Sequence, residues 1–177
     1  DICFVPDGKY SNLVRKLRPE SIQKGDIYHV DGSYLGEHNG IIDYTIGQRK
    51  GIRIGGRKDV TEIDAKLYVI SIDEKNNKIV VGPKRYLSCD EFSINECNWI
   101  IDSHKNKFDA LVKLRNTAKP VKVKIQTDLE KSSASVMLKN PEFGISPGQA
   151  AVFYDLVDKN RVLGGGWIKS TKNYLND

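Results

Sequence analysis

The sequence contains no apolar run approaching the ~20 residues that a helix needs to cross a bilayer, and no secretory signal pattern. Cysteine is also scarce: the chain has three, at Cys3, Cys89 and Cys97, and no Cys-x-x-Cys pair. An odd number of cysteines without such spacing supports neither a disulfide framework nor a zinc site. We therefore expect a soluble, cytoplasmic protein without membrane contacts or metal ligands.

A glycine-rich phosphate loop leading into a helix is missing as well. Such a loop is a common cradle for the phosphates of ATP, because its backbone N–H groups converge at a helix N-terminus. We therefore expect no ATP site within these 177 residues.

Acidic residues are nearly absent from two stretches, although the chain has 23 of them and a net charge of +5. Residues 45–58 contain no acid and five cations, namely Arg49, Lys50, Arg53, Arg57 and Lys58. Residues 103–125 contain Asp109 alone against seven cations, namely Lys105, Lys107, Lys113, Arg115, Lys119, Lys122 and Lys124. Clustered positive charge favours a polyanion partner such as nucleic acid. A solvated basic face is the alternative for either stretch taken alone.

Short β-type segments dominate the chain after Asp64, where we place a domain boundary. The segments are 67–72, 78–81, 97–101, 111–114, 121–126, 133–138, 149–154 and 161–168. The first two flank a polar loop and predict a hairpin. Short strands without intervening helices predict a closed barrel or a sandwich, so the fold class is mainly β.

The first 64 residues mix a helical and a β pattern, which predicts a small α+β domain. Apolar residues at i, i+3, i+4 and i+7 between Tyr10 and Leu17 predict a short helix. Residues 25–30 and 33–35 predict strands around the turn Asp31-Gly32. His29 and His38 are isolated in the sequence and are interpreted as structural.

Two local patterns leave their function open. Cys3, in Asp1-Ile2-Cys3-Phe4-Val5-Pro6-Asp7-Gly8, is either a thiol held at a loop mouth or a small hydrophobe in a core strand. In Gly47-Gln48-Arg49-Lys50-Gly51, an amide and two cations lie between glycines. These donors could bind phosphate, or the segment could be a basic turn.

Four segments together resemble the bacterial tRNA-specific 2-thiouridylases. They are residues 1–8, Tyr44-Thr45-Ile46-Gly47-Gln48-Arg49-Lys50-Gly51, Ser146-Pro147-Gly148-Gln149-Ala150-Ala151-Val152-Phe153-Tyr154, and Leu163-Gly164-Gly165-Gly166-Trp167-Ile168. They occur in the order of that family and span nearly the whole chain. The resemblance implies a C-terminal fragment that lacks the ATP-binding pyrophosphate-loop domain of the family.

The resemblance also implies a reaction. ATP, a substrate bound by the missing N-terminal domain, adenylates the 2-carbonyl oxygen of the wobble uridine, and sulfur then displaces AMP. Cys3 matches the catalytic cysteine that receives this sulfur as a persulfide. The implied partners are tRNA and a sulfur-donor protein, either a cysteine desulfurase or a sulfur relay protein.

Further site residues follow from the same resemblance. It implies a central domain (1–64) with the cysteine loop, and an elongation-factor-like β-barrel (65–177) that holds tRNA. The tRNA-contacting pair of the family aligns with Arg115 and Asn116, where Asn116 replaces the usual tyrosine, and its Pro-Gly-Gln glutamine aligns with Gln149. The resemblance gives Gln48, Arg49 and Lys50 one of two roles: they lie near the tRNA, or they hold the cysteine loop in position.

Two rival functions remain. One is a non-catalytic RNA-binding barrel of the translation machinery, in which Cys3 is structural. The other is a protein-interaction module of a translation factor, which explains the barrel but neither Cys3 nor the Gly47–Gly51 loop.

Overall fold

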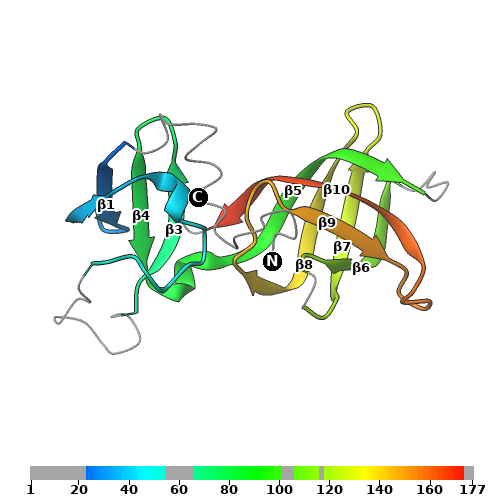
Figure 1. Ribbon diagram of the computed structural model, residues 1–177. Helices are drawn as coiled ribbons and strands as arrows, with labels where there is room; N and C mark the ends of the chain where they lie inside the picture. Colours follow the sequence, from blue (N-terminus) through cyan, green and yellow to red (C-terminus); the bar gives the residue numbers. More distant parts are fainter. Residues whose placement is uncertain (1–22, 55–65, 101–105, 116–117, 174–177) are drawn as a thin grey trace, which may run out of the picture. The chain divides into compact units, whose positions relative to one another are not determined.

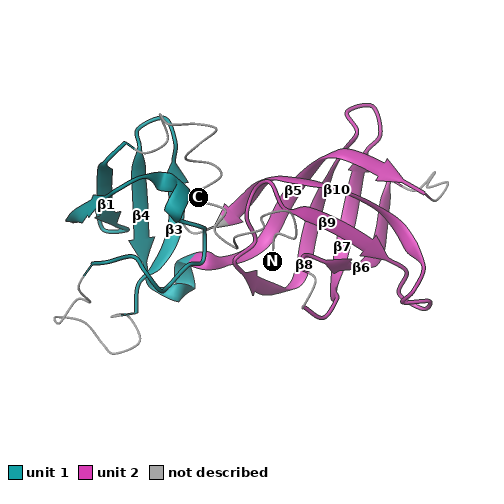
Figure 2. Ribbon diagram, viewed as in Figure 1, with its two compact units in different colours: residues 1–86 teal, residues 87–177 magenta. Residues whose placement is uncertain are grey.

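The structure is a computed structural model that describes residues 23–54, 66–100, 106–115 and 118–173. The chain forms two compact units, Asp1–Tyr86 and Leu87–Asp177, coloured separately in Figure 2. The predicted helix between Tyr10 and Leu17 lies outside the described residues, as does the loop of Cys3. The elements that are described are mostly strands, and this confirms the prediction of a mainly β chain.

Unit 1 contains a sheet in the order β2-β1-β4-β3 (Figure 1). Its strands are β1 (Gly25–His29), β2 (Tyr34–His38), β3 (Tyr68–Asp73) and β4 (Lys78–Gly82). β1 and β2 form one antiparallel hairpin and β3 and β4 another, while β1 and β4 pair in parallel at the centre. Ile27, Val69, Ile79 and Val81 are fully buried on these strands and form the core of the unit.

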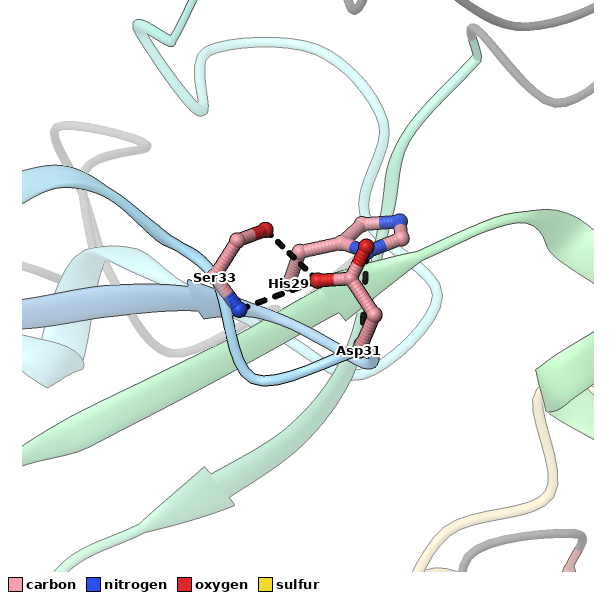
Figure 3. A network of polar contacts seen from close by, with 3 residues as sticks. All are labelled: His29, Asp31 and Ser33. Atoms are coloured by element: carbon pink, nitrogen blue, oxygen red, sulfur yellow. Dashed lines mark hydrogen bonds and ion pairs between the residues drawn. The ribbon is translucent and has the colours of Figure 1, made fainter.

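The β1–β2 hairpin closes with a network of polar contacts at the predicted Asp31-Gly32 turn (Figure 3). Asp31 accepts hydrogen bonds at Oδ1 from the Ser33 N–H (2.9 Å) and from the Ser33 hydroxyl (2.6 Å). Its other carboxylate oxygen lies 2.9 Å from Nδ1 of His29. Gly32 has a φ of +88°, a conformation that glycine adopts readily. His29 is therefore part of a turn, in line with its structural interpretation.

The position of the β3–β4 hairpin differs from the expected domain division. The hairpin itself forms as predicted, but β4 pairs with β1, so the hairpin belongs to the first unit and not to the barrel. The division therefore falls between Tyr86 and Leu87, within the short 3₁₀ turn η3 (Lys84–Leu87), and not near Asp64. Local periodicity identifies a hairpin but carries no information on which sheet the hairpin will join.

In unit 2, six described strands close into an antiparallel barrel in the order β10-β5-β8-β7-β6-β9 (Figure 1). They are β5 (Ser88–Trp99), β6 (Lys107–Lys113), β7 (Val121–Asp128), β8 (Ser133–Phe143), β9 (Ala150–Tyr154) and β10 (Val162–Asn173). Closure leaves no open sheet edge along the ring. The predicted barrel is confirmed.

β7 shows how the sequence builds the barrel wall. Val123, Ile125 and Thr127 are buried, whereas Lys122, Lys124 and Gln126 alternate with them and are exposed. Successive side chains of a strand point to opposite faces, so the apolar set fills the interior and the lysines cover the outside. The inner layer is completed by large side chains from other strands, among them Phe92, Ile94, Phe153 and Ile168.

β5 is longer than the pattern predicted, since the predicted strand (97–101) overlaps only its last residues, 97–99. Its first part carries polar residues such as Asp90 and Glu91 on the outer side, while Cys89, Phe92 and Ile94 are buried. A register shift between Cys89 and Glu91 interrupts the alternation. A bulge of this kind breaks the alternation of buried and exposed residues, so the strand is not recognised from a period-two pattern in the sequence.

The glycine run Gly164–Gly166 lets β10 lie close against its neighbours. A Cβ on Gly164 would lie 2.5 Å from the Asn98 carbonyl oxygen, and one on Gly166 would lie 2.7 Å from the Asn95 carbonyl oxygen. Both acceptors belong to β5, so any side chain at these positions would push the two strands apart.

Candidate nucleic-acid interface

The Gly47–Gly51 loop of unit 1 is anchored to β3 through its backbone. The Gly47 N–H donates to the Val69 carbonyl (2.8 Å), and the Val69 N–H donates to the Gln48 carbonyl (2.9 Å). Gly47 and Gly51 have φ values of +85° and +81°, which are strained for other residues. The two glycines thus provide the turns expected of them.

The side chain of Gln48 stabilises this loop from within. Its Oε1 accepts a hydrogen bond from the Thr45 N–H (2.9 Å), and its Nε2 donates to the Lys50 carbonyl (3.0 Å). Arg49 and Lys50 are exposed. Of the three predicted RNA-binding residues in this loop, the two cations face solvent, whereas the amide of Gln48 is hydrogen-bonded to the loop itself.

Next to this loop, unit 1 has a cavity of about 450 Å³. It is lined by Glu37, His38, Asn39, Asp43, Tyr44, Gly51 and Arg53. Burial raises the pKa of Tyr44, and the nearby Arg53 partly opposes this effect. Two carboxylates and one guanidinium are among its lining groups, so charges of both signs face this cavity.

His38 is a structural residue of this cavity wall. It is 2% exposed, its Nδ1 accepts from the Gly40 N–H (3.1 Å), and its Nε2 lies 3.1 Å from the Asn77 carbonyl oxygen. An Nδ1 that accepts leaves the proton on Nε2, which then donates to Asn77. Both ring nitrogens are engaged, so His38 joins the end of β2 to the β3–β4 turn.

In the barrel, Arg115 contacts the loop that follows β8. Its Nη2 donates to the Phe143 carbonyl (3.1 Å) and also to the Gly144 carbonyl. Gly144 has a φ of +70° and leaves room for this guanidinium, because a Cβ there would collide with Nη2. Arg115 therefore holds the start of the β8–β9 loop in place.

Gln149 lies at the other end of the same loop. Its backbone carbonyl accepts from the Ile168 N–H (2.8 Å), which ties the loop end to β10. Its side-chain Oε1 is buried and has no hydrogen-bond partner among the described residues. Buried polar atoms are nearly always paired, so this acceptor is an exception within the described part of the chain. The structure thus places two predicted RNA contacts, Arg115 and Gln149, at the two ends of one loop.

A second surface of the barrel was only partly predicted from the sequence. The outer face of β6, β7 and β8 carries a shallow depression, which we call the lysine groove. Its polar and exposed lining residues are Lys107, Asp109, Lys122, Lys124, Gln126, Ser135, Met137 and Lys139, and Phe108, Val123, Ile125 and Leu138 complete the lining. The charge pattern indicated Lys107, Lys122 and Lys124. Met137 and Lys139 lie on β8, outside the basic stretch, and only the strand register brings them to the other residues.

The two remaining described cysteines are poor nucleophiles. Cys89 is 1% exposed, and burial raises the pKa of its thiol. Burial likewise raises the pKa of Cys97 from 9.0 to about 11. Both thiols are thus neutral near pH 7, whereas the thiolate is the reactive form. Cys3 and Asn116, the other predicted site residues, lie outside the described residues.

The described part of the chain contains neither a metal site nor a membrane-spanning helix. No group of three or more His, Cys, Asp or Glu side chains there could hold a metal ion. None of its helices has the length and apolar character needed to cross a membrane.

Comparisons with known proteins agree on one family. Residues 11–83 match the family model of the tRNA methyl transferase PRC-barrel domain, and residues 89–168 match that of the aminomethyltransferase β-barrel domain. The chain is 47% identical to a tRNA-specific 2-thiouridylase of Sphingopyxis alaskensis over 97% of its own length and 41% of that protein.

Two further relatives show the same pattern. A tRNA-specific 2-thiouridylase of Roseobacter denitrificans is 47% identical, and one of Rickettsia canadensis is 46% identical. Each match covers 95% of this chain and 43% of the relative. The chain thus spans about two-fifths of the length of the curated relatives it matches, and it belongs to the family of the tRNA-specific 2-thiouridylases.

Proposed function

We propose that this chain is part of an enzyme that transfers sulfur to the 2-position of the wobble uridine of tRNA. The observation that carries the proposal is the identity of 47% over 97% of the chain to a tRNA-specific 2-thiouridylase. The closed barrel, with a basic outer face, supports a role in holding RNA, because clustered cations attract a polyanion.

The proposed chemistry begins with ATP as a substrate, bound by a part of the enzyme outside these 177 residues. Adenylation of the uridine 2-carbonyl oxygen releases pyrophosphate and converts that oxygen into a leaving group. The terminal sulfur of a persulfide on Cys3 then attacks the carbon, and AMP leaves with the oxygen. A second cysteine of the enzyme attacks the Cys3 sulfur, which releases the transferred sulfur and leaves a disulfide.

Cys3 is proposed as the sulfur carrier, and the sulfur comes from a donor protein, either a cysteine desulfurase or a relay protein. The properties of the other two cysteines support Cys3 as the sulfur carrier, because neither of them suits that role. Burial keeps Cys89 and Cys97 protonated at neutral pH, and a protonated thiol neither attacks a donor persulfide nor forms a disulfide readily. We place this reaction in the cytoplasm.

The barrel is proposed to bind tRNA through the β8–β9 loop and its neighbours. Gln149 has a side-chain carbonyl oxygen that lacks a partner in the described chain, and turning this side chain outward would let it accept from a ribose 2′-hydroxyl or a base N–H. Arg115 keeps the loop in position and presents its charge nearby, and Asn116 adds a polar contact to sugar or phosphate. In the first unit, Arg49 and Lys50 are proposed to contact RNA phosphates, with Gln48 shaping their loop.

The decisive experiment uses the full-length protein with Cys3→Ser. We expect it to lose 2-thiouridine formation while its affinity for tRNA stays nearly unchanged, measured by nucleoside analysis and by filter binding. A variant that thiolates at the parent rate would refute the role of Cys3.

The second candidate function is a non-catalytic RNA-binding barrel, which the basic outer face of the barrel also fits. Detection of a persulfide on Cys3 after incubation with a cysteine desulfurase and cysteine separates the two. A tRNA-binding chain whose Cys3 never carries sulfur would favour the RNA-binding module.

A further inference from the structure

The lysine groove is built from two strand-to-strand rows of side chains on the outer face of the barrel. In one row Asp109, Lys124 and Met137 are directly opposite one another on β6, β7 and β8. In the next row Lys107, Gln126 and Ser135 are opposite one another. Directly opposite side chains lie close enough to act on one ligand.

The groove consists of two adjoining hollows of about 530 and 400 Å³. Asp109, Lys124 and Met137 line both hollows, so they mark the place where the two meet. Lys122 and Lys139 line the second hollow only.

Positive charge dominates this surface. Four lysines and one aspartate line it, a net charge of +3. The aspartate is engaged, since Asp109 lies 3.7 Å from the Lys122 ammonium. No ion pair joins Lys124 or Lys139 to a carboxylate in the described ranges. Beyond Met137 the next acid is Glu91, which contacts Lys172 and the Ser135 hydroxyl.

The centre of the groove carries one exposed apolar side chain beside its charged ones. Met137 is 54% exposed, and it lies between Lys124 on one side and Glu91 on the other in the register of the strands. It is the one large apolar side chain of the groove lining that is strongly exposed in the described chain. A flexible thioether among cations fits the face of a ribose or a base whose phosphates meet the lysines.

We propose that the lysine groove is a second RNA-contacting surface, separate from the β8–β9 loop, which binds the sugar-phosphate backbone of tRNA through Lys107, Lys124 and Lys139 and packs Met137 against a sugar or base. The inference rests on the proposed function, since it takes tRNA as the partner. A protein partner is disfavoured, because protein interfaces centre on aromatic or apolar anchors and are depleted of lysine.

The test measures binding of an unmodified tRNA with a wobble uridine to the 177-residue chain over a range of salt concentrations. Each phosphate contact adds roughly one unit to the slope of log affinity against log salt. We expect Lys124→Ala and Lys139→Ala each to shallow the slope by about one unit and the double variant by about two. Met137→Ala is expected to weaken binding without changing the slope, because it removes no charge.

Lys159→Ala is the matched control. It removes the same charge from an exposed position in the β9–β10 turn, outside the groove. Its slope is expected to equal that of the parent. Unchanged thermal unfolding of all variants would show that altered slopes come from lost contacts and not from altered folding.

The outcomes separate this inference from the proposed function. If the parent binds tRNA, the full-length enzyme thiolates it, and both lysine variants keep the parent slope, the groove assignment is wrong and the proposed function stands. If the parent chain itself shows no salt-dependent binding of tRNA, both the groove assignment and the proposed tRNA contact of the barrel are wrong. Polyglutamate that competes as strongly as tRNA at the groove would indicate an acidic protein partner and overturn the assignment to RNA.

Discussion

The guanidinium of Arg115 occupies the space beside Gly144 where a side chain would otherwise lie. Its Nη2 bonds the carbonyls of Phe143 and Gly144, and a Cβ on Gly144 would lie 2.3 Å from the same nitrogen. Arg115, which the resemblance predicts as an RNA contact, is therefore a structural residue of the β8–β9 loop.

Arg115→Ala should destabilise the barrel even without RNA. Losing charge-assisted hydrogen bonds to two carbonyls, one of them on the buried Gly144, should lower the free energy of unfolding by about 1–3 kcal/mol, measured in urea. Lys159→Ala, an exposed cation of the same unit, is the control and should change stability by less than about 0.5 kcal/mol. Equal stabilities for both variants would show that the hydrogen bonds contribute nothing.

Gly144→Ala should also lower the free energy of unfolding of the barrel, through steric and backbone strain. The added methyl group would displace the Arg115 guanidinium, and the φ of +70° is itself unfavourable for alanine by roughly 1–2 kcal/mol. In the background of Arg115→Ala the steric part should vanish and the backbone part remain, so a double-mutant cycle measures the coupling. Strictly additive effects would mean that the two residues do not interact.

Gln48→Ala should loosen the Gly47–Gly51 loop, because the amide makes one hydrogen bond to Thr45 and one to Lys50. We expect a loss of roughly 1 kcal/mol in unfolding free energy and faster hydrogen exchange at the Thr45 amide. Arg49→Ala, next to it and exposed, should leave both unchanged. A Gln48 variant with parent-like exchange at Thr45 would indicate that the loop holds its shape through glycine and backbone contacts alone.

Cys89→Ser and Cys97→Ser should retain thiolation activity in the full-length protein, in contrast to Cys3→Ser. Cys89 is fully buried, so a polar hydroxyl in its place should cost about 1 kcal/mol of stability. At neutral pH both thiols should react slowly with iodoacetamide in the folded chain, because their raised pKa values keep them protonated. Rapid alkylation of Cys89 in the native state would contradict its burial.

Cys97 should make stability fall at high pH. In the folded chain its pKa is raised from 9.0 to about 11. The contribution of the neutral thiol to the free energy of unfolding is therefore fully present below pH 9.0. This contribution is lost progressively as the pH rises from 9.0 through about 11. In urea unfolding, Cys97→Ala should therefore show a weaker loss of stability over that window than the parent chain. If stability falls with pH in parallel for the two proteins, the pKa of Cys97 is not raised by folding.

The local features of this protein follow from its amino-acid sequence alone. Period-two alternation in 121–126 is enough to form β7 with lysines outside and valine and isoleucine inside, because neighbouring strand residues face opposite sides. The Asp31-Gly32 turn and the glycines at 47 and 51 follow from backbone sterics, which also act locally. Four segments in family order were sufficient to identify the family.

Which distant segments meet depends on long-range strand pairing, which becomes visible in the folded chain. The β3–β4 hairpin joined the first sheet because β4 pairs with β1, a choice between long-range partners that local pattern does not express. Lys139 lies outside the basic stretch of the sequence, yet the register of β7 and β8 brings it into the lysine groove. Arg115 gained a structural role because Gly144 left space for it. In each case the contact joins residues far apart in the chain, and it exists only once the strands have paired.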